Sequence, residues 1–138
     1  MSFQTFASLQ NQRILILGQT SKYVAVATEH LYALLRPDIS RIRVDADWYL
    51  SKHPDVREAV ERGEVSSAEE HYHTSGYFEH RMPYPIVVDE RWYLEQYPDI
   101  QNAVSEGIFD SGQHHFDVAG YREGRYPFAQ FRLEQAQE

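Results

Sequence analysis

Side chains with the chemistry to bind a ligand occur in two sets, and each residue of the second set lies 44 residues after its counterpart in the first. The two sets consist of a tryptophan followed by a tyrosine, then a histidine and an arginine: Trp48, Tyr49, His71 and Arg81, and again Trp92, Tyr93, His115 and Arg125. An indole ring can stack on an apolar ligand, a sugar or a base while histidine and arginine hold its polar groups. The sequence therefore predicts these eight residues as a candidate binding site.

A structural interpretation of the same residues competes with this one. The aromatic rings then fill the core, the histidine satisfies a buried backbone group, and the arginine pairs with a neighbouring aspartate or glutamate. Residues present in both copies of a duplicated unit are those that every copy needs in order to fold. The duplication itself thus favours the structural interpretation.

The histidines also offer an alternative metal site. Imidazoles gathered from the two copies, namely His71, His73, His114 and His115, contain the nitrogen ligands that zinc prefers. Spacings of one and two residues do not place two side chains on one helical face, unlike the four-residue spacing of zinc-protease helices. We therefore expect no metal and no other cofactor.

Signs of catalysis are few. The chain has no cysteine, and it shows no nucleophile elbow, no phosphate-binding glycine loop and no pair of carboxylates spaced as an acid and a base. Glu79 or Glu123, near an arginine and a histidine, is the best candidate for a general base. The sequence favours a non-enzymatic protein and leaves a small enzyme open as the alternative.

An internal repeat explains the paired residues. Residues 44–83 align without a gap with residues 88–127, and 17 of these 40 positions are identical. We call these segments copy 1 and copy 2. A fixed period of this length is typical of a supersecondary unit used twice, each copy covering the apolar side of the other.

Each copy has the punctuation of three short helices. The expected signals are an aspartate that caps the first helix, a proline that opens the second and a glycine that ends it: Asp45, Pro54 and Gly63, or Asp89, Pro98 and Gly107. A third helix is expected to begin at Ser66 or Asp110 and to end at Gly76 or Gly120.

The predicted fold is all-α, with an N-terminal helical hairpin and two pseudo-symmetric repeats of three short helices. Residues 1–43 form the hairpin, residues 44–87 the first repeat, and residues 88–138 the second repeat with a C-terminal tail. The hairpin is expected to contain a helix that stops at Gly18 and another that begins at Thr20 or Ser21 and ends before Pro37. A strand over residues 14–17 is the alternative to the first of these helices.

Charge and hydropathy restrict the partners. The net charge is −8, which argues against duplex nucleic acid because binding to its backbone requires clustered cations. The N-terminal apolar run is too short for a signal peptide or a membrane span. We therefore predict a cytoplasmic protein, and we expect that the apolar residues of 1–43 can serve as a surface for homo-oligomerisation.

The sequence of copy 2, VDERWYLEQYPDIQNAVSEGIFDSGQHHFDVAGYREGRYP, resembles a short tandem bacterial repeat. That repeat has tyrosine-leucine, tyrosine-proline-aspartate-valine, histidine-tyrosine and glutamate-glycine-arginine phrases. It is often attached to glycosyltransferases of polysaccharide assembly or to large secreted proteins. The resemblance covers residues 44–127 only, and copy 1 departs from it at His53 and His80. It implies an accessory module and carries no catalytic residues.

Together these features predict a non-enzymatic binding or adaptor module. Its partner is expected to be a protein, or less favourably a glycan, recognised through an acidic and tyrosine-rich surface. The alternative is a small enzyme or a ligand- or metal-binding protein with histidine and arginine in the groove between the repeats.

Overall fold

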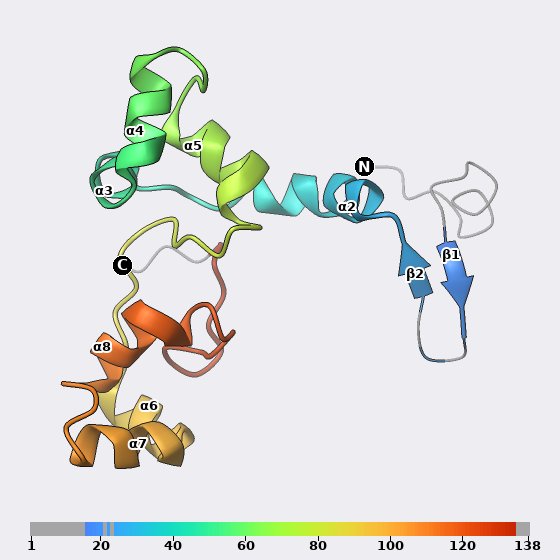
Figure 1. The fold of residues 1–138 in the computed structure, drawn as a ribbon. Helices are drawn as coiled ribbons and strands as arrows, with labels where there is room; N and C mark the ends of the chain where they lie inside the picture. Colours follow the sequence, from blue (N-terminus) through green and yellow to red (C-terminus); the bar gives the residue numbers. More distant parts are fainter. Residues whose placement is uncertain (1–15, 21, 23, 135–138) are drawn as a thin grey trace. The chain divides into compact units, whose positions relative to one another are not determined.

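Helices dominate the computed structural model of the chain, which describes residues 16–20, 22 and 24–134 (Figure 1). Most of the regular structure in the described residues is helical and very little is strand, so the predicted all-α class is confirmed. The chain divides into two compact units, residues 1–40 and residues 41–138. Of the described helices, none is long and apolar enough to cross a membrane.

A β-hairpin takes the place of the expected helical pair in the first unit. Strand β1 (Ile16–Gln19) pairs antiparallel with β2 (Val24–Val26), and the helix α2 (Thr28–Ile39) follows. β-Branched residues in both segments favour strands over helices. The predicted helical hairpin of residues 1–43 is therefore wrong where it is described, and its first helix before Ile16 lies outside the described residues.

Helix α2 differs from its prediction at both ends. It begins at Thr28 because the preceding residues form β2, and it continues through Pro37, where a stop was expected. Proline within the last turn removes only one helical hydrogen bond, and the Ser40 amide still donates to the Arg36 carbonyl at 2.9 Å. Leu31 and Leu34 on this helix are 41% and 53% exposed, and association through residues 1–43 stays a prediction.

The same order of elements occurs in both copies of the second unit (Figure 1). Copy 1 contains α3 (Ala46–Lys52), α4 (Pro54–Glu61), α5 (Ala68–His71) and the π-helical turn η1 (Tyr72–Gly76). Copy 2 contains α6 (Glu90–Gln96), α7 (Pro98–Ser105), α8 (Gly112–His115) and the π-helical turn η2 (Phe116–Gly120).

The predicted caps of the first two helices are confirmed. Asp45 accepts a hydrogen bond from the Trp48 amide at 3.1 Å, and the equivalent aspartate of copy 2 does the same at 3.0 Å. Gly63 and Gly107 follow the second helices with φ of 73° and 75°, the left-handed conformation that glycine adopts without strain.

The third helix starts one residue later than predicted and ends differently. Its N-caps are Ser67 and Ser111, which follow the expected positions Ser66 and Asp110. Gly76 and Gly120 do not terminate a helix through a left-handed φ. They lie at the ends of the π-helical turns, where a Cβ atom would overlap the hydroxyl of Tyr49 or Tyr93.

Each copy closes around buried aromatic rings. Tyr49 and Tyr72 in copy 1, and Tyr93 and Phe116 in copy 2, are fully buried. The amide of the capping aspartate donates to the carbonyl of the last proline, from Asp45 to Pro83 at 2.9 Å and from Asp89 to Pro127 at 3.0 Å. Residues 79–88, which we call the connecting segment, run from the last residues of copy 1 to the first residue of copy 2.

Candidate functional site

The paired tyrosines and histidines bond to each other inside each copy. The Tyr49 hydroxyl lies 2.9 Å from Nδ1 of His71, and the Tyr93 hydroxyl lies 2.9 Å from Nδ1 of His115. Burial lowers the pKa of both imidazoles and raises that of both phenols, so all four groups are neutral near pH 7. The histidines thus satisfy a buried tyrosine instead of the expected backbone group.

The paired arginines are held by carboxylates, as the structural interpretation expected. Arg81 donates to both oxygens of Asp55 at 3.1 and 2.8 Å and to Glu79 at 2.6 Å. In copy 2 Arg125 makes the same contacts with Asp99 and Glu123. The hydrogen bonds from Arg81 lower the pKa of the Asp55 carboxyl to about 2. Both guanidinium groups are therefore neutralised within their own copy.

The paired tryptophans are less buried than their tyrosine neighbours. Both indoles are partly exposed. Trp92 packs against the core of copy 2, and Trp48 lines a recess beside copy 1. Of the eight residues predicted as a site, Trp48 and Arg81 line this recess, and a binding role for the other six stays a prediction.

The alternative metal set does not come together. His71 bonds to Tyr49, His73 lies 2.8 Å from the Ile42 carbonyl, His114 lies 3.5 Å from Asp110, and His115 bonds to Tyr93. Within the described part of the chain, no cluster of three or more histidine, aspartate or glutamate side chains is placed to hold a metal ion.

The described tyrosines differ widely in exposure. Tyr126 is exposed, and four others are half-buried: Tyr32, Tyr77, Tyr97 and Tyr121. Four are buried, namely Tyr49, Tyr72, Tyr84 and Tyr93. Recognition through a tyrosine-rich surface therefore stays a prediction.

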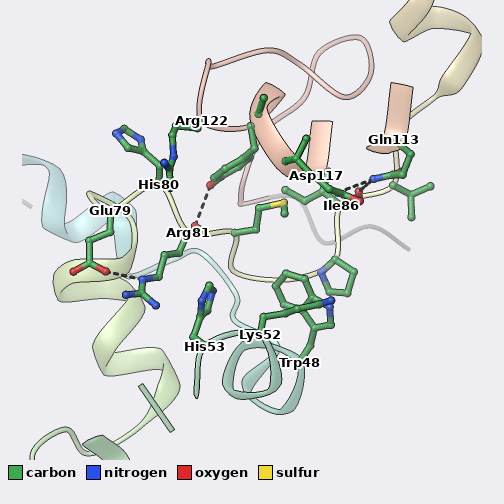
Figure 2. Close-up of a pocket in the computed structure, with 16 residues that line it drawn as sticks. Trp48, Lys52, His53, Glu79, His80, Arg81, Ile86, Gln113, Asp117 and Arg122 are labelled. Atoms are coloured by element: carbon green, nitrogen blue, oxygen red, sulfur yellow. Dashed lines mark hydrogen bonds and ion pairs between the residues drawn. The ribbon is translucent and has the colours of Figure 1, made fainter. Parts of the chain in front are cut away.

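A recess with a volume of about 850 Å³ lies between the two copies (Figure 2). This volume is within the range of ligand pockets. Helix α3, the connecting segment and helix α8 with the turn after it contribute its lining: Trp48, Lys52, His53, Glu79, His80, Arg81, Met82, Pro85, Ile86, Val87, Gln113, Asp117, Val118, Ala119, Tyr121 and Arg122.

Hydrogen bonds fix the walls of the recess. The Tyr121 hydroxyl of copy 2 donates to the Arg81 carbonyl of copy 1 at 3.3 Å. Gln113 donates to the Ile86 carbonyl at 3.0 Å and to Asp117 at 2.9 Å, and it accepts from the Val88 amide at 2.7 Å. The hydrogen bond of Tyr121 joins the two copies at the recess, and those of Gln113 hold Ile86 and Val88 against helix α8.

Several lining residues differ between the copies. Lys52, His53, His80 and Arg122 occupy the positions that Gln96, Tyr97, Gly124 and Phe78 occupy in the other copy. His53 and His80 were visible in the sequence as departures of copy 1, whereas Lys52 and Arg122 were not predicted as site residues. The available signal was a cation in one copy facing an uncharged residue in the other.

His53 carries an unpaired polar atom. In copy 2 the equivalent Tyr97 accepts a hydrogen bond from the Tyr126 amide at 2.8 Å. The shorter histidine leaves its Nε2 buried without a hydrogen-bond partner in the described structure. Burial lowers the pKa of His53, so the ring presents a neutral imidazole to the recess.

Comparisons with known proteins give no relative. No family model matches the sequence, and no match is found among curated proteins or solved structures.

Proposed function

We propose that this protein is a non-enzymatic binding module that receives a segment of a protein partner in the recess between its two copies. The observation that supports this most is the division of labour among the polar groups. The paired Tyr–His and Arg–Asp side chains are bonded within each copy. Most of the residues that line the recess differ between the copies, and the shared ones are Trp48, Glu79, Arg81 and Tyr121. A scaffold of two similar copies, with a recess whose lining is not repeated, is suited to the recognition of a partner.

A small enzyme is the second candidate, because His53 and His80 lie in the recess. A histidine that transfers protons in catalysis is typically oriented by a carboxylate within hydrogen-bond distance. The carboxylates that line the recess are already engaged, Glu79 by Arg81 at 2.6 Å and Asp117 by Gln113 at 2.9 Å. The arrangement therefore supports binding better than chemistry.

The recess also has exposed apolar groups that suit a protein segment. Val87 and Val118 are 66% and 61% exposed and both line it. Exposed aliphatic side chains that border a concavity are typical of surfaces that bind another chain.

Two matched substitutions test the proposal. Val118→Asn changes a recess residue, and Ile108→Asn changes a residue of copy 2 that is 62% exposed but outside the recess. Neither changes the net charge. A partner captured from the native host by the wild-type protein is purified and titrated calorimetrically against all three proteins.

We expect Val118→Asn to weaken the affinity about tenfold, because one buried aliphatic contact is lost. Ile108→Asn should stay within about twofold of the wild type. Equal effects of the two substitutions, or no direct binding by the wild type, would contradict the proposal.

A further inference from the structure

The charge of the recess is opposite to that of the molecule. The chain has a net charge of −8, yet Lys52, Arg81 and Arg122 line the recess against only Glu79 and Asp117. Arg81 is neutralised by its own carboxylates. In the described structure Lys52 and Arg122 have no ion pair, so their charges are available to a ligand.

The two free cations lie on opposite sides of an apolar floor. Figure 2 shows Lys52 beside Trp48 on one side and Arg122 beside His80 on the other. Met82, Pro85, Ile86 and Val118 supply aliphatic surface in the same recess. The recess thus combines an aromatic and aliphatic floor with separated positive charges.

His80 has a left-handed backbone conformation, which among the described non-glycine residues it shares with Gln130 alone. Its φ is 58°, whereas the equivalent residue of copy 2 is Gly124 with φ of 75°. A side chain at a left-handed position costs free energy that glycine avoids, and residues held this way gather at functional sites. Copy 1 nevertheless carries an imidazole there, at the side of the recess where Arg122 lies.

From these features we infer that the partner segment is an acidic peptide. Its carboxylates pair with Lys52 on one side and with Arg122 and His80 on the other, and its apolar side chains pack on Trp48 and Val118. This inference rests on the proposed function and specifies the chemistry of the partner. Charge complementarity of this kind steers association and selects the partner.

An acidic glycan fits the recess less well than an acidic peptide. Sugar hydroxyls require many hydrogen-bond acceptors and donors, whereas both carboxylates of the recess are already bonded to Arg81 and Gln113. The aliphatic lining would leave those hydroxyls without partners. Apolar side chains of a peptide have no such requirement.

The experiment selects peptides from a phage-displayed library of random sequences and measures the selected peptides by fluorescence anisotropy. The test variant is Lys52→Glu/Arg122→Glu. The control is Arg57→Glu/Arg132→Glu, which reverses two exposed cations outside the recess. Both double variants have the same net charge, so long-range repulsion is identical. A soluble polygalacturonate serves as the acidic glycan probe.

We expect enrichment of peptides that combine Asp or Glu with large apolar residues. Lys52→Glu/Arg122→Glu should weaken their binding tenfold or more, and the control pair should weaken it no more than about threefold. Enriched peptides without acidic residues, or equal losses in the two variants, would overturn the acidic specificity. The proposed function would then still stand if Val118→Asn weakens the same peptides.

Two other outcomes separate the alternatives. Failure to enrich any peptide would overturn both the inference and the proposed protein partner. Binding of polygalacturonate that disappears in Lys52→Glu/Arg122→Glu, without any peptide binding, would assign the recess to an acidic glycan.

Discussion

Copy 1 and copy 2 have the same order of helices and turns, and the residues that differ between them fall into two kinds. Some differences are compensated within the copy, so that the same contact is made by other atoms. Others, namely Lys52, His53, His80 and Arg122, have no such compensation and line the recess between the copies. Residues shared by the two copies thus stabilise the fold of each copy. Residues that occur in one copy only lie where the surface can acquire a function.

The hydrogen bond from the third helical segment to the carbonyl two residues before each copy, which we call the tether, is a compensated difference. In copy 1 His73 lies 2.8 Å from the Ile42 carbonyl. Copy 2 has Asp117 at that position, and its Oδ1 accepts a hydrogen bond from Gln113 at 2.9 Å. There Gln113, which replaces Glu69, donates to the equivalent carbonyl of Ile86 at 3.0 Å and also to Asp117. Two changes one helical turn apart preserve one contact.

Truncation of the buried tyrosines should have the largest effect on the comparison. Tyr49→Ala and Tyr93→Ala each remove a fully buried ring and the hydroxyl bonded to His71 or His115. We expect a loss of about 3–5 kcal/mol for either, which is much of the net stability of a domain. Urea unfolding followed by circular dichroism measures the loss.

Tyr126→Ala is the control, because Tyr126 is 52% exposed and should change stability by less than about 1 kcal/mol. If only one of the two buried tyrosines mattered, the equivalence of the copies would fail.

An exchange of the tether should have an intermediate effect. His73→Asp removes the donor to the buried Ile42 carbonyl, and we expect a cost of about 1–3 kcal/mol. Glu69→Gln alone should be nearly neutral because Glu69 is exposed. The double variant Glu69→Gln/His73→Asp copies the pattern of copy 2 and should recover at least about 1 kcal/mol.

The same urea titration measures this coupling energy. Strict additivity of the two single changes would show that copy 1 cannot use the tether of copy 2.

The sequence predicted the interior of this unit better than its recess. Periodicity and caps located α3, α4, α6 and α7, because Asp, Pro and Gly signals act within a few residues. The short-range signals failed before α2, where β-branched residues paired across a turn. They also failed in η1 and η2, where a tyrosine from another helix lies against Gly76 or Gly120, a contact that local sequence signals do not encode.

The candidate site required contacts that no local pattern encodes. Lys52 and Arg122 are 70 residues apart, and only the stacking of the copies brings both to one recess. The paired Trp, His and Arg residues attracted attention because they repeat, yet repetition reflects the needs of the fold. Columns that differ in charge between copies would have identified the recess cations.

The exchange of His80 and Gly124 should have the smallest effect on stability. It distinguishes a residue that contacts the partner from one that is only tolerated in a turn. Both residues have a left-handed backbone, with φ of 58° and 75°. His80→Gly relieves the strain of a side chain there and should raise the free energy of unfolding by about 0.5–1 kcal/mol. Gly124→His should lower the free energy of unfolding by a similar amount. A Cβ at Gly124 meets no atom within 4 Å, so the cost is the backbone strain alone.

Binding should respond in the opposite pattern. His80→Gly is expected to weaken the acidic peptide about threefold while the protein becomes more stable, because an imidazole of the recess is lost. Gly124→His, outside the recess, should leave the peptide affinity unchanged while the protein becomes less stable. Chemical denaturation and anisotropy on the same samples measure both quantities. If affinity rose and fell with stability in the two variants, His80 would be a tolerated substitution in a turn and not a residue that contacts the partner.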